Sequence, residues 1–341
     1  MARRLPAEWE PQDGVLLCWP HPDTDWGPRL DWVEPVFTEL VRQISRFASV
    51  LLVARDEPLV ADILHRAGVP RPRVQLYPLP SDDTWARDCG PLTVLDDGSP
   101  RLMDFTFNGW GGKYPAQRDD RLTAELHRAG AFGTTPLETP GLVLEGGSVD
   151  SDGAGTLLTT TRCLLHPGRN PQLDRAGVEA ALGRWLGAER VLWLEHGELQ
   201  GDDTDAHVDT LARFAPGDTI VYQGCADPAD PHFGPLERMA AELAEFRNRE
   251  GRAYRLLPLP WPKPRFDDDG IRLPATYANF LVVNDAVLLP TYGDPADAPA
   301  AEILADAFPG REVVAVPCAP LLEQHGSLHC LTMQIPRGVL P

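Results

Sequence analysis

The sequence predicts an α/β fold made of repeated strand–helix units, and three observations support this prediction. Short apolar runs alternate with segments of helical periodicity along the chain. Two late segments share one order of elements. Proline makes up 35 of the 341 residues, about twice its usual share. Such a composition favours many fixed turns and short elements over long helices.

The expected elements follow one another at short intervals. Apolar residues spaced three or four apart predict the helices, and short apolar runs predict the strands. The expected strands are 49–55, 155–160, 218–224 and 285–293, and the expected helices are 34–47, 57–67, 119–129, 172–186, 235–249 and 299–308.

A repeat is visible in the last two units. YQGCADPADPHFGPLERMAAEL and TYGDPADAPAAEILADAF both read as a strand, an Asp-Pro-Ala-Asp turn and a helix. The turns begin at Asp227 and Asp294, which are 67 residues apart (294 minus 227). A chain of 341 residues holds about five such periods, so we expect about five units. No Pro/Ser-rich linker interrupts the chain, which predicts one closed domain over residues 1–341.

The net charge argues against several classes of partner, and the apolar pattern argues against export and membrane insertion. The net charge is −19 and the pI is near 4.8, which argues against nucleic acid and anionic membranes and suits a small cationic substrate. The N-terminal MARRLPAEWEPQDG has no apolar segment of a signal peptide. No apolar run approaches the ~18 residues of a membrane span, so we expect a soluble cytoplasmic protein, with a homodimer as the default assembly.

The six cysteines show no metal-binding or disulfide spacing. No CxxC pair is present, and we expect reduced thiols. Cys18 and Cys318 lie in apolar runs and are expected in the core, while Cys163 and Cys225 remain unassigned, as does His325. Cys330 differs because it ends the polar bend HGSLHC.

Four polar islands interrupt the apolar pattern. They are DDTWARDCGP (82–91), LEGGS (144–148), GDDTDAHVDT (201–210) and HGSLHC (325–330). In an extended segment His207 and Asp209 would share one face. Asp88 offers a second carboxylate, and Glu145 precedes two glycines that leave it uncrowded.

A cysteine, a histidine and surplus carboxylates together suggest a cationic substrate. A thiol nucleophile needs a base and one orienting group, and further carboxylates would oppose the thiolate. They are useful when the substrate is a guanidinium, because its planar N–H donors pair with carboxylates. Such a cation would also lower the pKa of the attacking thiol.

The polar islands and several further motifs of the chain resemble those of the agmatine deiminase family, which is similar to the Porphyromonas-type peptidylarginine deiminases. The resemblance rests on DDTWARDCGP, FNGWGGKY, LEGGS, GTLLTTTRCLLHPGRNP, GDDTDAHVD, the terminal HC and TMQIP, and it covers essentially the whole chain. It implies a five-bladed α/β propeller of pseudo-fivefold symmetry, the pentein fold. It also implies hydrolysis of agmatine to N-carbamoylputrescine and ammonia, a step of putrescine and polyamine biosynthesis, with no cofactor and no metal.

The resemblance also implies roles for individual residues. Cys330 would be the nucleophile, presented by its Gly-Ser bend at the mouth of a site and not in the core. His207 would be the general acid and then the general base. Asp88 and Asp209 would hold the guanidinium, and Glu145 would pair with His207 and orient it. The chain departs from the family pattern at Gln324–Leu328, at Cys89 and at Ala206, which leaves open how the far end of the substrate is recognised.

Several alternatives remain open at this stage. The substrate could be free or peptidyl arginine, the acceptor could be an amine, or the protein could bind guanidinium without turnover. Trp85, Trp110 and Tyr114 could stack on a cationic tail or only pack, and we interpret His329 as structural. We expect at least two of Asp202, Asp203 and Asp205 to cap a turn or helix, with a divalent-cation site shared with Asp209 as a minor alternative.

Overall fold

The computed structural model describes residues 3–341, so the first two residues of the expected domain lie outside the described part. The strands are β1 Gln12–Cys18, β2 Ser49–Val53, β3 Val74–Tyr77, β4 Leu92–Asp96, β5 Ser99–Met103, β6 Leu137–Glu138, β7 Val149–Ser151, β8 Thr156–Thr160, β9 Arg190–Leu194, β10 Ala212–Ala215, β11 Thr219–Gln223, β12 Arg255–Leu259, β13 Leu281–Val283, β14 Ala286–Thr291, β15 Glu312–Pro317 and β16 Met333–Pro336.

Helices connect these strands. The α-helices are α1 Leu30–Ile44, α2 Glu57–Arg66, α3 Ala86–Cys89, α4 Gly109–Gly112, α5 Leu122–Arg128, α6 Thr161–Leu164, α7 Arg175–Leu186, α8 Phe233–Glu245 and α9 Asp297–Ala307. The 3-10 turns are η1 Gly27–Arg29, η2 Arg71–Arg73, η3 Asp119–Arg121, η4 Gly146–Ser148, η5 Val208–Thr210, η6 Ala319–Gln324 and η7 His329–Leu331.

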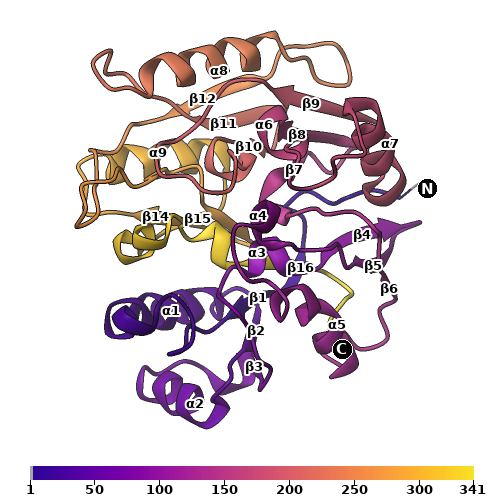
Figure 1. Ribbon diagram of the computed structural model, residues 1–341, viewed down its shortest axis with the longest axis vertical. Coiled ribbons are helices and arrows are strands. Elements are labelled where there is room, and N and C mark those ends of the chain that lie inside the picture. Colours follow the sequence, from indigo (N-terminus) through magenta and orange to yellow (C-terminus); the bar gives the residue numbers. More distant parts are fainter. Residues whose placement is uncertain (1–2) are drawn as a thin grey trace.

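The strands form five small mixed sheets. Their orders are β16-β1-β2-β3, β4-β5-β6, β7-β8-β9, β10-β11-β12 and β13-β14-β15. In each sheet the first two strands are antiparallel, and the second pairs in parallel with a strand reached through a helical crossover. Figure 1 shows the sheets in different sectors of the molecule, with α3 near the middle. The fold is therefore mixed α/β and contains five related units.

The first sheet joins the two ends of the chain. Strand β16 pairs antiparallel with β1, so Met333 lies opposite Leu16. Both side chains are buried in one large apolar core that also includes α1 and β2. This pairing brings the residues just before β16, among them Cys330, next to elements from the start of the chain.

The expected repeat is present in the last two sheets. Strand β11 leads through α8 to β12, and β14 leads through α9 to β15, with a parallel pairing at the end of each crossover. Helix α8 buries Leu236, Met239 and Leu243 as predicted, but it ends at Glu245. Phe246 is extended, because the chain turns there toward Asn248, whose side-chain oxygen accepts hydrogen bonds from two following backbone N–H groups.

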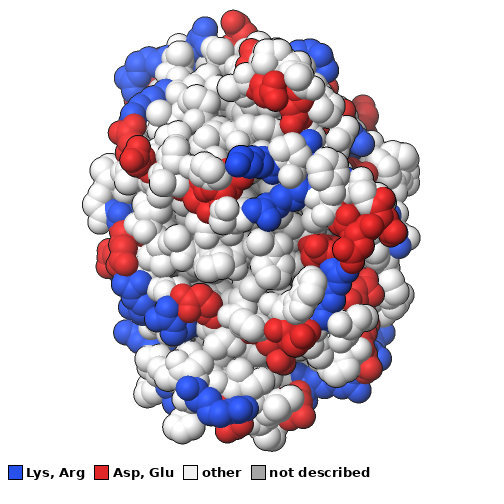
Figure 2. All heavy atoms as spheres, turned by 90° about the vertical axis from the view of Figure 1, so that its left-hand side faces the viewer, with Lys and Arg blue, Asp and Glu red and all other residues white. Residues whose placement is uncertain are grey.

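The surface carries both signs of charge. Acidic and basic side chains are interspersed over the face drawn in Figure 2 and do not gather into one large basic field. Among the described residues, no helix is long and apolar enough to cross a membrane.

Candidate active site

The polar islands lie at equivalent places in the fold. Single-turn elements α3, η4, η5 and η7 directly precede the first strands of four sheets, namely β4, β7, β10 and β16. The segment before β13 carries Asn279 at the corresponding place. Contacts join α3 to η7 and η4, and η4 to η5. Each of the five units therefore supplies polar groups to one shared location.

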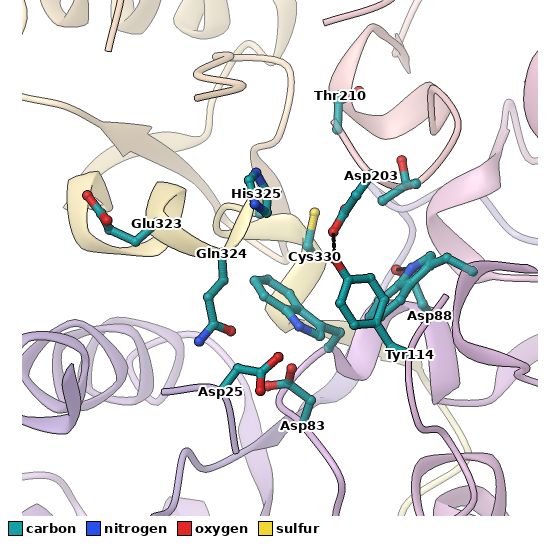
Figure 3. Close-up of a pocket in the computed structure, with 14 residues that line it drawn as sticks. Asp25, Asp83, Asp88, Tyr114, Asp203, Thr210, Glu323, Gln324, His325 and Cys330 are labelled. Carbon is teal, nitrogen blue, oxygen red and sulfur yellow. Dashed lines mark hydrogen bonds between the residues drawn. The ribbon is translucent and has the colours of Figure 1, made fainter. Parts of the chain in front are cut away.

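A cavity of about 260 Å³ opens at this location. Its walls include Trp85 and Trp110, the two tryptophans considered above as contacts for a cationic tail. Asp88 and Cys330 also line it (Figure 3). The complete lining is Asp25, Asp83, Trp85, Asp88, Trp110, Tyr114, Asp203, Thr204, Thr210, Glu323, Gln324, His325, Gly326 and Cys330. The loop that departs from the family pattern thus forms part of the wall.

Asp88 is fixed by two donors. Trp110 Nε1 donates to Asp88 Oδ2 at 2.9 Å, and the backbone N–H of Gly147 donates to Oδ1 at 3.0 Å. Trp110 is itself held edge-to-face between Phe107 and Tyr114. Burial raises the pKa of Asp88, and the charge of Asp209 raises it further against the opposing effect of His207. The two carboxylates therefore repel each other in a buried place, a situation that a cation would relieve.

Asp209 presents one oxygen that has no partner. Its Oδ2 accepts hydrogen bonds from His329 Nδ1 at 2.7 Å and from Asn279 Nδ2 at 3.2 Å. Its Oδ1 is buried without a hydrogen-bond partner among the described residues. An unpaired buried acceptor costs about 1–3 kcal/mol, so an N–H donor of a ligand would bind favourably there.

Cys330 lies at the buried side of the cavity and not at its mouth, which corrects the expectation. The residue is only 6% exposed and packs in the main core while its thiol lines the cavity. Sγ lies 3.4 Å from Asn279 Oδ1 and 3.9 Å from Asp209 Oδ2. Burial raises the pKa of the Cys330 thiol well above its ordinary value, and Asp209 and Asp88 raise it further. The thiol is therefore protonated at neutral pH.

His207 is buried and its ring makes no hydrogen bond within the described part of the chain. Nδ1 lies 3.6 Å from Asp88 Oδ1, and neither ring nitrogen has a partner. Burial lowers the pKa of His207, but the charge of Asp88 and the neighbouring Cys163 outweigh this effect, so its pKa lies well above the ordinary value. The raised pKa favours the protonated imidazolium, which can act as a general acid.

Glu145 does not form the expected hydrogen bond with His207. Both of its oxygens accept from Arg169 Nε at 2.9 Å. The other nitrogens of Arg169 donate to Asp205 Oδ2 at 2.8 Å and to the carbonyl oxygen of Thr204 at 2.9 Å. Glu145 therefore connects through Arg169 to the loop that carries His207, and its carboxylate stays within 4.8 Å of the imidazole.

The local backbone around His207 also differs from the prediction. Val208–Thr210 forms a 3-10 turn and is not extended, so alternation along a strand is not what brings His207 and Asp209 together. The close approach of these side chains depends instead on Gly147, which has no Cβ. A Cβ built on Gly147 would lie 2.6 Å from His207 Nδ1, 2.9 Å from Asp88 Oδ1 and 3.1 Å from Asp209 Oδ2. All three side chains close over this glycine.

The neighbouring aspartates have separate roles. Asp202 caps a turn, because its carboxylate accepts from the backbone N–H groups of Thr204 and Ala206. The other two instead contact the FNGWGGKY loop: Asp203 accepts from the Tyr114 hydroxyl, and Asp205 pairs with Lys113 and Arg169. The expectation of two turn caps was therefore wrong for one of them.

The minor divalent-cation alternative is not supported either. Within residues 3–341 the group with closely spaced metal-ligand atoms is Glu145, Cys163 and His207, and it contains none of the clustered aspartates. The carboxylate oxygens of those aspartates are directed toward the turn and loop groups described above.

Sequence reasoning missed several residues of the site. Asn279 is fully buried, and its Oδ1 accepts from the backbone N–H groups of His329 and Cys330 at 2.9 and 3.2 Å. A single amide inside the apolar run YANFLVV was the available signal. Arg169 stood in a quoted motif without a role, and the contribution of Glu8 could not be found because its side-chain hydrogen-bond partners lie more than 200 residues away.

Comparisons with known proteins give one consistent answer. Residues 4–336 match the model of the Porphyromonas-type peptidyl-arginine deiminase family. The chain is 36% identical to an agmatine deiminase of Stutzerimonas stutzeri, over 97% of this chain and 95% of that protein.

Two solved structures extend the comparison. A Porphyromonas gingivalis protein, provisionally titled an arginine deiminase, is 46% identical with a TM-score of 0.93, covering 99% of this chain and all of that one. A cysteine-to-serine variant of a C. jejuni agmatine deiminase with substrate bound is 34% identical with a TM-score of 0.91, covering 99% and 97%.

Proposed function

Because the chain belongs to the Porphyromonas-type peptidyl-arginine deiminase family, we propose that it is an agmatine deiminase, a C–N hydrolase that converts agmatine to N-carbamoylputrescine and ammonia. One observation carries the proposal: the thiol of Cys330 lines an acidic cavity with Asp88 and lies 3.9 Å from Oδ2 of Asp209, whose Oδ1 has no partner among the described residues. A planar guanidinium bound between these carboxylates would donate a hydrogen bond to the unpaired oxygen of Asp209. The central carbon of the guanidinium would then be open to attack by the thiol.

In the first half of the reaction, the substrate helps to ionise its own nucleophile. The guanidinium charge offsets Asp88 and Asp209, whose charges raise the pKa of the Cys330 thiol in the free enzyme. The thiol releases its proton to solvent as the guanidinium binds, and the thiolate then forms a C–S bond with the guanidinium carbon. The imidazolium of His207 donates its proton to the departing nitrogen, the C–N bond breaks, and ammonia leaves with the bonding electron pair.

In the second half, water completes the exchange. Neutral His207 takes a proton from water, whose oxygen adds to the carbon of the S-alkylthiouronium intermediate. The C–S bond then breaks, its electron pair returns to Cys330, and the remaining hydroxyl proton restores the thiol as the ureido product is released. Through Arg169, Glu145 holds the loop of His207 and keeps the imidazole in place for both transfers.

The cavity lining favours agmatine over arginine. Among the described residues that form it, none is Lys or Arg, whereas Asp25, Asp83, Asp203 and Glu323 are part of it. Asp25 and Asp83 lie together on the side away from Cys330 (Figure 3). Burial, and then the charge of Asp25, raise the pKa of Asp83 to about 7. Such a wall suits the ammonium tail of agmatine and opposes the α-carboxylate of arginine. Peptidyl arginine, which lacks that carboxylate, is the second candidate.

Ammonia release tests this proposal. Wild type, Cys330→Ala and the matched control Cys225→Ala are incubated with agmatine, free arginine and a blocked arginyl peptide. We expect turnover of agmatine that disappears only in Cys330→Ala. Turnover of the peptide would transfer the assignment to protein-arginine deimination. No turnover of any of the three, with binding of agmatine retained, would favour a guanidinium-binding protein.

Broader features of the protein complete the proposal. The five sheets, each with one polar segment before its first strand, support a closed five-bladed propeller that forms one domain over residues 1–341. We further propose that the enzyme acts without a cofactor or metal, in the cytoplasm, as a homodimer, and that its product serves putrescine and polyamine biosynthesis.

A further inference from the structure

The ring of His329 lies between two buried carboxylates. Nδ1 is 2.7 Å from Asp209 Oδ2, and Nε2 is 2.7 Å from Glu8 Oε2. An ionised carboxylate accepts hydrogen bonds but donates none. If both carboxylates are ionised, both ring nitrogens must therefore carry a proton.

Further contacts support ionised carboxylates on both sides. Glu8 accepts from Arg213 Nη2 at 2.8 Å and lies 3.5 Å from Arg87 Nη2. Burial opposes ionisation of Glu8, but Arg213 and then His329 hold its pKa well below the usual range. Burial opposes ionisation of Asp209 as well, yet the hydrogen bond and charge of His329 lower its pKa.

The contact also decides which oxygen of Asp209 can meet a ligand. His329 and Asn279 occupy Oδ2, which is also the oxygen 3.9 Å from Cys330 Sγ, so Oδ1 is the oxygen left without a partner among the described residues. A neutral His329 could keep only one of its two carboxylate contacts as a donor. The other carboxylate would then face the lone pair of the unprotonated ring nitrogen. The orientation of Asp209 would no longer be fixed.

We propose that His329 is a positioning residue, an imidazolium whose two ring N–H groups donate to Asp209 and Glu8 and which thereby holds Asp209 with its free oxygen toward the guanidinium. The interpretation of His329 as merely structural is thereby revised. The charged groups around the ring are Asp209 from η5, Glu8 before β1, Arg87 from α3 and Arg213 from β10. The catalytic consequence rests on the proposed deiminase function, but the protonation state does not.

The direct test is a nuclear magnetic resonance spectrum of protein labelled with 15N in its histidine rings. His329 is assigned as the signal missing from His329→Asn. We expect both of its ring nitrogens to carry a proton, each as the donor to one of the two carboxylates. A wild-type spectrum with only one protonated nitrogen overturns the proposal, whether or not the protein turns over any guanidine.

Kinetics of Glu8→Gln provide the second measurement. The neutral amide can turn its NH2 group toward Nε2, so the ring and Asp209 lose their fixed orientation and kcat/KM should fall by about 10- to 100-fold. The loss should appear mainly in KM, because Asp209 binds the guanidinium. Glu10→Gln is the matched control, since Glu10 pairs with Arg4. A folded Glu8→Gln variant with the wild-type KM and kcat contradicts the positioning role.

Discussion

Replacing Gly147 by alanine tests whether the side chains of His207, Asp88 and Asp209 need a residue without a Cβ at this position. The new Cβ would lie 2.6 Å from His207 Nδ1 and 2.9 Å from Asp88 Oδ1, whereas ordinary contact begins near 3.4 Å. The imidazole must therefore retreat by about 0.8 Å, the difference between 3.4 and 2.6 Å. A displacement of about 1 Å costs about 10²-fold in rate, or about 2.7 kcal/mol of transition-state stabilisation. We expect kcat/KM for agmatine to fall by about that factor.

The assay and its control separate crowding from unfolding. Ammonia release is measured below the unfolding temperature of the variant, because overpacking also costs about 1–3 kcal/mol of folding free energy. Gly141→Ala serves as the matched control, since a Cβ there meets nothing within 4 Å. A Gly147→Ala enzyme within about threefold of wild type would refute the geometric argument.

Three further predictions concern the same site. Arg169→Met leaves a buried carboxylate unpaired and should lower the free energy of unfolding in urea by about 3–5 kcal/mol; a loss below about 1 kcal/mol contradicts this role. Asp88→Asn removes a charge that raises the pKa of the Cys330 thiol, so alkylation by iodoacetamide, followed by mass spectrometry, should begin at lower pH than in wild type; an unchanged or higher midpoint opposes the electrostatic account. Gly326→Ala would place its Cβ 2.2 Å from the Trp85 ring and should raise KM for agmatine by about tenfold, and an unaltered KM argues against Trp85 as a wall of the substrate cavity.

Much of the fold could be predicted because its determinants are local. Apolar periodicity located the longer helices α1, α2, α5, α7, α8 and α9 and the strands β2, β8, β11 and β14, but not the other strands. The turn at Asp227 and its echo at Asp294 revealed repeated units. Helix ends were less predictable. The apolar pattern of α8 continues to Phe246, but the turn organised by Asn248 stops the helix at Glu245.

The site was predictable where polar residues cluster in sequence. The islands around Asp88, His207 and Cys330 were found in this way, and the structure brings them together. The groups that position them were not, because Asn279 and Glu8 are isolated residues that reach the site only through long-range pairing. Local sequence therefore indicates reactive groups better than it indicates the residues that orient them.

The most direct test of the account is to stop the reaction with acid during turnover of agmatine and map the enzyme by mass spectrometry. The account predicts an adduct on Cys330 with the mass of agmatine less ammonia, absent from Cys330→Ala. An adduct on another cysteine, or turnover by Cys330→Ala at the wild-type rate, would contradict the assignment of Cys330 as the nucleophile.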